Sequence, residues 1–142
     1  MTNTHVIPLG LSAEIRAACN KRNKIKPVKA MDDNNIMQNV EDLVCHCVSD
    51  LMTQRRGVEV KVTSQDVYDG KKNVPFARIA ARGFIFNLLH NCFGFPYSVI
   101  SQRSGMKATS IMRSVRKCRD LTERDNLYRE ISDEIDKKLF MM

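Results

Sequence analysis

The chain of 142 residues has no long hydrophobic run, and this absence excludes integral membrane proteins of the helical kind. No uninterrupted apolar segment approaches the roughly 18 residues that a membrane-spanning helix needs. The first residues also lack the apolar region of a secretory signal peptide. We therefore expect a soluble, cytoplasmic protein with one hydrophobic core, since this length suits a single domain.

The motifs that would indicate an enzyme, a cofactor or a metal site are missing as well. No Gly-x-x-x-x-Gly-Lys-Ser/Thr phosphate loop occurs. The tripeptide Cys45-His46-Cys47 resembles a metal-binding cluster, but adjacent residues of a helix point about 100° apart and cannot close on one ion. His90 and Cys92, two residues apart, also face apart on a helix. The sequence predicts reduced cysteines, no metal, no cofactor and no enzymatic activity.

Acidic residues are absent from one long stretch of the chain. Between Gly83 and Arg119 there are six basic side chains and no acidic one, whereas residues 32–53 contain five acidic side chains and no basic one. The net charge of +7 is therefore distributed in blocks. A surface polarised in this way presents one basic face to a polyanion.

Residues 1–33 form a basic arm in this interpretation, separate from the domain at 34–142. Ser12 is suited to cap a short helix over residues 11–21, and a basic linker broken by Pro27 follows it. Two interpretations remain open for the arm: a tethered helix and a solvated flexible tail.

Hydrophobic periodicity predicts long helices in the domain. Residues 34–54 carry an apolar stripe at helical spacing, and residues 74–93 are apolar on nearly all sides, which is typical of a central core helix. Gly83 in that second helix predicts a close approach of another helix. A last helix is predicted to begin at a Thr122-x-x-Asp125 capping signal, with Leu127 and Ile131 starting its apolar stripe.

The valines between Gly57 and Asn73 suggest a different structure. Val58, Val60 and Val62 alternate with charged residues, and an Asp-Gly turn signal follows at residues 69–70. A short β-hairpin and a loop insertion both fit this pattern.

Residues 95–119 predict two helices joined by a glycine turn. Pro96 suits the start of the first helix and Gly105 its end. In the second helix an apolar side recurs at three- and four-residue spacing, while the other side is basic. The apolar side consists of Ala108, Ile111, Met112, Val115 and Cys118. This is the outline of a helix-turn-helix.

From residue 34 to residue 139 the order of these elements resembles the C-terminal DNA-binding domain of the bacterial replication initiator DnaA, a Trp-repressor-like helix-turn-helix fold. Four segments carry the resemblance: IMQNVEDLVCHCVSDLMTQRR, ARGFIFNLL, GFPYSVISQRSG and TSIMRSVRKCRDL. The resemblance implies an all-α helical bundle that binds duplex DNA. It implies a role in replication initiation or transcription control, in a phage or mobile element for example.

The same resemblance assigns roles to particular residues. It implies that Arg55 or Arg56 enters the minor groove, that Arg82 contacts the DNA backbone, and that the start of the recognition helix reads base edges. In the family that helix begins Asp-His-Thr-Thr, whereas here the positions are Lys107, Ala108, Thr109 and Ser110. Because lysine donates where aspartate accepts, the target site should differ from the family's.

Charge and position complete the predicted DNA-binding surface. Arg78, Arg82, Arg113 and Lys117 are expected to neutralise phosphates, and the Ala108 methyl to pack against a thymine methyl. Without a phosphate loop, the chain resembles the DNA-reading module without the ATPase motor. The alternative is an adaptor in which the acidic 34–54 helix and the basic arm bind a protein partner and DNA binding is incidental. The oligomeric state stays open.

Overall fold

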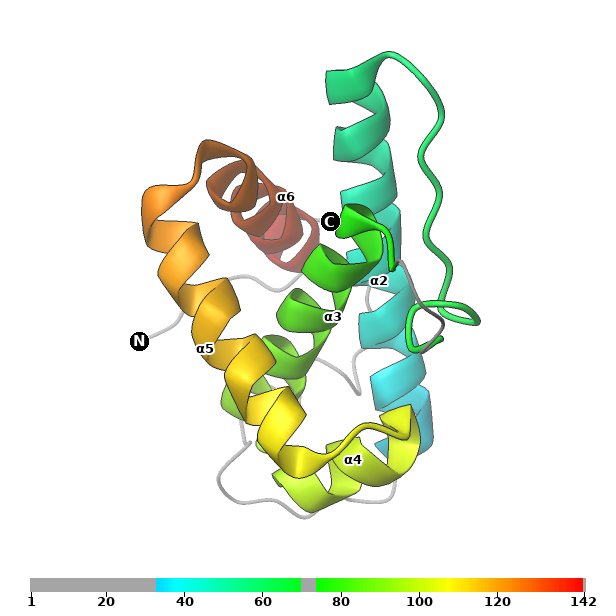
Figure 1. Ribbon diagram of the computed structural model, residues 1–142, viewed down its shortest axis with the longest axis vertical. Helices are drawn as coiled ribbons and strands as arrows, with labels where there is room; N and C mark the ends of the chain where they lie inside the picture. The colour runs from blue at the N-terminus through cyan, green and yellow to red at the C-terminus, as the bar shows by residue number, and fades with distance from the viewer. Residues whose placement is uncertain (1–32, 70–73, 142) are drawn as a thin grey trace.

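The computed structural model describes residues 33–69 and 74–141, and this part of the chain is all-helical (Figure 1). Its elements are α2 (Asp33–Arg56), α3 (Phe76–Asn87), the π-helical turn η1 (Leu88–Cys92), α4 (Tyr97–Ser104), α5 (Ala108–Arg124) and α6 (Asn126–Met141). The predicted all-α bundle is confirmed. The short helix and basic linker predicted for the arm lie outside the described residues, as does most of the Asp-Gly turn. No helix in the described ranges is long and apolar enough to cross a membrane.

Helix α3 is the centre of the bundle. It lies between α2 and α5 and packs against both, while α6 packs against α2 and α5 (Figure 1). Ala80, Ala81, Ile85 and Phe86 are completely buried, as the nearly all-round apolar pattern predicts. The helix continues without interruption into the wider π-type turn that ends at Cys92.

The close helix approach predicted at Gly83 is confirmed, and the neighbour is α5. A Cβ added at Gly83 would lie 2.9 Å from the Cβ of Cys118 and 3.6 Å from the backbone oxygen of Ser114. A separation of 2.9 Å is far inside van der Waals contact, and neither neighbouring atom is the end of a flexible chain. The missing side chain therefore sets the distance between α3 and α5.

Replacing Gly83 with alanine is expected to destabilise the fold by about 1–3 kcal/mol, because overpacking costs more than the helix propensity that alanine gains. Urea denaturation of the two proteins measures the difference. In a Cys118→Gly background the contact is relieved, so the same change should stabilise α3 by up to about 1 kcal/mol. Equal effects in both backgrounds would contradict the close-packing account.

The segment after α2 is a loop insertion, and the hairpin alternative finds no support in its described part. Residues 58–63 run beside α2 without forming a strand (Figure 1). The Ser49 hydroxyl of α2 bonds both backbone groups of Val62, and the Thr53 hydroxyl bonds both backbone groups of Val60. The alternating valines fit this arrangement, because helix hydroxyls here take the place of a second strand.

Helices α4 and α5 follow the predicted layout with two differences. Gly105 ends α4 in the left-handed conformation (φ 77°), and Pro96 is the N-cap, one residue before the helix begins. Ile111, Val115 and Cys118 are buried as predicted, and Ala108 is half-buried. Met112, predicted to be on the apolar side, is instead 40% exposed. It lies about 100° around α5 from Ile111, outside the narrow stripe that meets the core.

The predicted capping residue of the last helix, Thr122, is wrong by three residues. Helix α5 continues to Arg124, and Asp125 caps α6, its Oδ1 accepting hydrogen bonds from the backbone nitrogens of Leu127 (2.9 Å) and Tyr128 (3.1 Å). The Thr122 hydroxyl donates to the Cys118 oxygen one turn earlier (2.8 Å), a bond that keeps it inside α5. Both residues can cap a helix, and the aspartate does so here.

Candidate nucleic-acid interface

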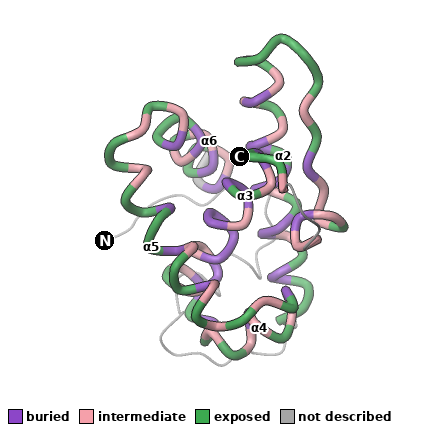
Figure 2. Tube along the Cα trace, viewed as in Figure 1, coloured by how far each residue is buried: buried purple, intermediate pink, exposed green. Residues whose placement is uncertain are grey.

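One face of α5 is left open because the opposite face meets the core. Ile111, Val115 and Cys118 are buried, and exposed stretches lie between them along α5 (Figure 2). Residues about half a turn around the helix from these three therefore face solvent. We call this surface, together with the residue just before the helix, the α5 outer face. We limit it to residues 107–119, before the acidic Asp120, and it consists of Lys107, Thr109, Met112, Arg113, Arg116, Lys117 and Arg119, all of them exposed.

The cations of the α5 outer face have no described partner. Within residues 33–69 and 74–141, Lys107, Arg113, Arg116, Lys117 and Arg119 make no ion pair and no side-chain hydrogen bond. The next cation along the helix differs, because Arg124 pairs with Asp120 one turn before it. Five positive charges on one side of a helix repel one another, so the face favours a polyanionic partner that neutralises them.

The four residues predicted to read base edges lie at the start of α5, where the turn from α4 ends. Lys107 and Thr109 are exposed, whereas Ala108 and Ser110 are half-buried. Lys107 occupies the N-cap position, and its ammonium group, which can only donate hydrogen bonds, does not cap the helix. The structure brings these residues together with the other two predicted α5 residues, Arg113 and Lys117.

Arg78 and Arg82 are placed elsewhere, on the side of α3 that faces residues 66–69. The Arg82 Nε donates to the Val67 oxygen (2.6 Å) and its Nη2 to the Asp69 oxygen, while Arg78 lies 3.8 Å from an Asp66 carboxylate oxygen. Burial, and then the charge of Arg78, lowers the pKa of Arg82. Both arginines therefore fasten the insertion to α3, and their phosphate contacts stay a prediction.

Arg55 and Arg56 end α2 at the opposite end of the molecule from the start of α5 (Figure 1). An Arg55 nitrogen lies 2.7 Å from a carboxylate oxygen of Glu130 on α6, and Arg56 is exposed. Their position in the last turn of α2 also suits the helix dipole. The structure does not bring them next to the α5 outer face, and the minor-groove contact stays a prediction.

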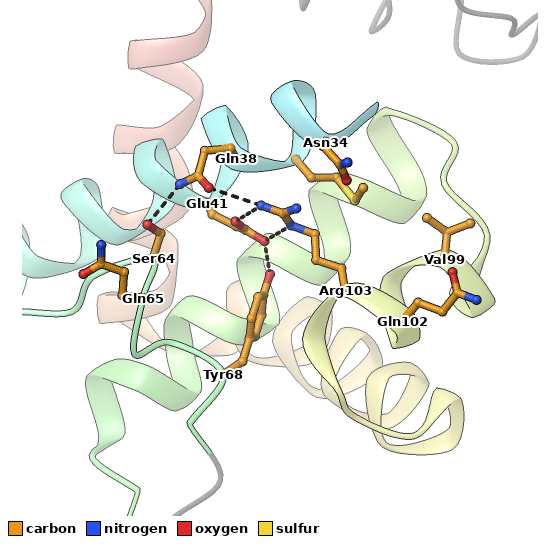
Figure 3. Close-up of a pocket in the computed structure, with 10 residues that line it drawn as sticks. Asn34, Gln38, Glu41, Ser64, Gln65, Tyr68, Val99, Gln102 and Arg103 are labelled. Carbon is orange, nitrogen blue, oxygen red and sulfur yellow. Dashed lines mark hydrogen bonds and ion pairs between the residues drawn. The ribbon is translucent and has the colours of Figure 1, made fainter. Parts of the chain in front are cut away.

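The sequence did not reveal a buried charge network that holds α4 in place. Glu41 on α2 is only 2% exposed, and its carboxylate accepts two hydrogen bonds from Arg103 of α4, from Nε (2.7 Å) and Nη2 (2.8 Å). The Tyr68 hydroxyl donates a third (2.7 Å), and Figure 3 shows both side chains converging on the carboxylate. The hydrogen bonds that Arg103 donates to Glu41 raise the pKa of Arg103, and burial raises the pKa of Tyr68.

A signal for this network is present in the sequence. Glu41 falls one turn after Met37 and one turn before Val44, inside the apolar stripe of α2, where an exposed carboxylate would not lie. An acidic residue in an apolar stripe needs a buried cationic partner. Only the fold identifies that partner as Arg103, since it lies in a separate helix.

A cavity of about 440 Å³ opens beside the network between α2, α4 and residues 64–68. Its polar side chains mostly satisfy one another, because Gln38 donates to the Ser64 hydroxyl (3.0 Å) and accepts from Arg103 (3.3 Å) (Figure 3). The cavity therefore belongs to the packing that fixes α4 to α2.

Three of the cysteines that the structure describes, Cys45, Cys47 and Cys118, are buried thiols. Cys45 and Cys47 lie in the core with His46 exposed between them, and in the described ranges no group of side chains is suited to hold a metal ion. Burial raises the pKa of Cys45, Cys47 and Cys118 to about 12. The stability tied to these protons is present below pH 9.0, the ordinary pKa, and is lost as the pH rises toward 12.

These three thiols should resist alkylation in the folded protein. A rise in pKa from 9.0 to about 12 lowers the thiolate fraction about 1,000-fold, and burial blocks access as well. Mass spectrometry after brief iodoacetamide treatment at pH 8 should find them unmodified in buffer and modified in urea. Modification in buffer at the rate of a free cysteine would show that the core is open.

No family model, curated protein or solved structure matches this chain. The function is therefore inferred from the chemistry of the α5 outer face.

Proposed function

We propose that this protein binds double-stranded DNA by placing α5 in the major groove. The observation that carries the proposal is the set of five exposed cations of the α5 outer face, which have no partner in the described chain. A major groove about 12 Å wide admits one α-helix, and phosphates line both of its walls. A helix with cations on its outer side and no acidic residue in its first three turns matches that environment.

In this proposal the two ends of the α5 outer face contact different parts of the DNA. Arg113, Arg116 and Lys117, spread over little more than one turn, neutralise phosphates on the groove walls and release counterions. Lys107 and Thr109, at the N-terminal end, meet the base edges, as the first residues of a recognition helix do. Phosphate contacts fix the register, and base contacts select the sequence.

Helix α4 has the place of the first helix of a helix-turn-helix. The left-handed Gly105 makes the sharp turn between α4 and α5, and the Arg103–Glu41 ion pair anchors α4 to α2. A fixed α4 pre-orients α5, so that less conformational freedom is lost on binding. The resemblance to the DnaA C-terminal domain supports a role in replication or transcription control, carried out without ATP hydrolysis.

Binding of a fluorescent 20-base-pair duplex at increasing salt concentration tests the proposal. Three neutralised phosphates give a slope of about −2.7 in log K against log salt, so affinity should fall about 40-fold between 50 and 200 mM salt. No binding at 50 mM salt, or a slope near zero, would refute it. The same measurement on the 34–142 domain tests the role of the basic arm. The same salt dependence there would show that DNA binding does not need residues 1–33.

A further inference from the structure

The insertion between α2 and α3 carries a second surface that the DNA proposal does not use. The Thr53 hydroxyl bonds the backbone nitrogen and oxygen of Val60 (2.9 and 3.1 Å), and the Ser49 hydroxyl those of Val62 (2.8 and 3.2 Å). Four residues of α2 rise about 6 Å, and two residues of extended chain span about 6.6 Å. The distance from Ser49 to Thr53 along α2 matches the distance from Val60 to Val62 only if residues 60–62 are extended. The segment runs antiparallel to α2 (Figure 1).

An extended segment directs its backbone groups alternately to its two sides. The backbone N–H and C=O groups of Val60 and Val62 face α2. The backbone groups of Glu59 and Lys61 therefore face away from α2. Within the described chain these outward nitrogens and oxygens have no hydrogen-bond partner, and both residues are exposed. Val58, at the start of the segment, is 61% exposed, the highest value among the large apolar side chains described. Residues 58–62 therefore form an open strand edge, the kind of surface that pairs with another strand.

We propose that this edge pairs with the same edge of a second copy of the chain, antiparallel and with the two-fold axis at Val60. Glu59 of each copy then lies opposite Lys61 of the other, and each such pair exchanges both backbone hydrogen bonds. Val58 lies opposite Val62 of the second copy, which covers its exposed side chain. The contact is isologous, as in most two-fold dimers.

Charge complementarity favours a second copy and also fixes the register. In the proposed register both cross-strand pairs join a carboxylate with an ammonium group, which stabilises the pairing. A shift of two residues in either direction places Lys61 opposite Lys61 or Glu59 opposite Glu59, and like charges in these positions repel. A shift of the register by one residue would require the backbone groups of Val60 and Val62 for pairing, and these are already hydrogen-bonded to α2. The segment is thus complementary to itself in a single register.

The dimer is expected to be weak. A ribbon of five residues from each copy buries well below the roughly 1,200 Å² of a standard interface, so dissociation constants of about 10⁻⁵–10⁻³ M are expected. Such a weak contact forms to a large extent only when two copies are already bound to the same partner molecule, because their pairing is then intramolecular.

Sedimentation equilibrium of the full chain from about 10 µM to 1 mM tests the pairing. Glu59→Lys alone and Lys61→Glu alone each place like charges in both cross-strand pairs and should weaken dimerisation at least 10-fold. The double change Glu59→Lys with Lys61→Glu restores opposite charges in the same register and should restore the dimer. Both side chains are exposed, so thermal unfolding should be the same in all four proteins.

A cross-link tests the register independently. In the proposed pair the two Val60 Cα atoms are about 4.5 Å apart, within disulfide range. Val60→Cys should therefore give a covalent dimer on mild oxidation, while Glu59→Cys, which lies opposite Lys61, should not, and neither should the wild-type chain. A wild-type chain that stays monomeric to 1 mM would overturn the inference. The inference would also be overturned if the single charge changes left dimerisation unchanged, or if the double change did not restore it. Either result would mean that the two copies meet through another surface.

Discussion

Replacing Arg103 with alanine is expected to lower the free energy of unfolding by about 3 kcal/mol. The change leaves the carboxylate of Glu41, which is 2% exposed, without its two charge-assisted hydrogen bonds. Removing one partner of a buried ion pair costs about 3–5 kcal/mol, and the lower figure applies because Arg103 itself is 22% exposed. Urea denaturation followed by circular dichroism measures the loss.

The matched control removes an arginine from an exposed ion pair. Arg124 and Asp120 are 70% and 53% exposed, so Arg124→Ala should change stability by less than about 0.5 kcal/mol. The double change Arg103→Met with Glu41→Leu replaces both charges with apolar groups and should recover most of the loss. A loss below about 1 kcal/mol for Arg103→Ala would mean that water reaches Glu41 and that the network does not anchor α4.

Neutralising three cations of α5 should reduce duplex affinity about 100- to 500-fold at 0.1 M salt. In the variant Arg113→Gln, Arg116→Gln and Lys117→Gln, three phosphate contacts are lost, and the salt slope should become shallower by about 2.7. The three side chains are exposed and unpaired in the described chain, so stability should not fall. Fluorescence anisotropy at four salt concentrations measures both quantities.

The control for this variant removes the same charge from α6. Arg129→Gln, Lys137→Gln and Lys138→Gln also lower the net charge by three, but these residues bond to α5 and α6 groups away from the α5 outer face. The salt slope should then change by less than about one unit. Equal losses from the two triple variants would mean that net charge, and not the α5 face, attracts DNA.

Local patterns in the sequence predicted the helices and most of the core. The three- and four-residue spacing in α5 identified Ile111, Val115 and Cys118, since periodicity reports which side of a helix is apolar. It failed for Met112 because the apolar stripe of α5 is narrower than the pattern suggests. The start of α6 was misplaced because Thr122 and Asp125 can both cap a helix, and only the packing decides between them.

Contacts between distant segments could not be predicted in the same way. The hydrophobic periodicity of α3 predicts that Arg82 lies outside the core. It does not predict that Arg82 donates hydrogen bonds to the carbonyl groups of Val67 and Asp69. The partnership of Glu41 with Arg103 joins residues 62 apart in the chain. Such pairs depend on how the helices pack, which single-sequence spacing does not encode.

Mapping the duplex onto the protein by NMR tests the central proposal most directly. Amide resonances of the full chain are followed during titration with a 20-base-pair duplex in 50 mM salt. We predict that the largest shifts fall between Gly105 and Asp120, on the turn and the exposed side of α5, with small shifts in α6. Shifts concentrated in α2 or α6, or no shifts at all, would contradict the placement of DNA on the α5 outer face.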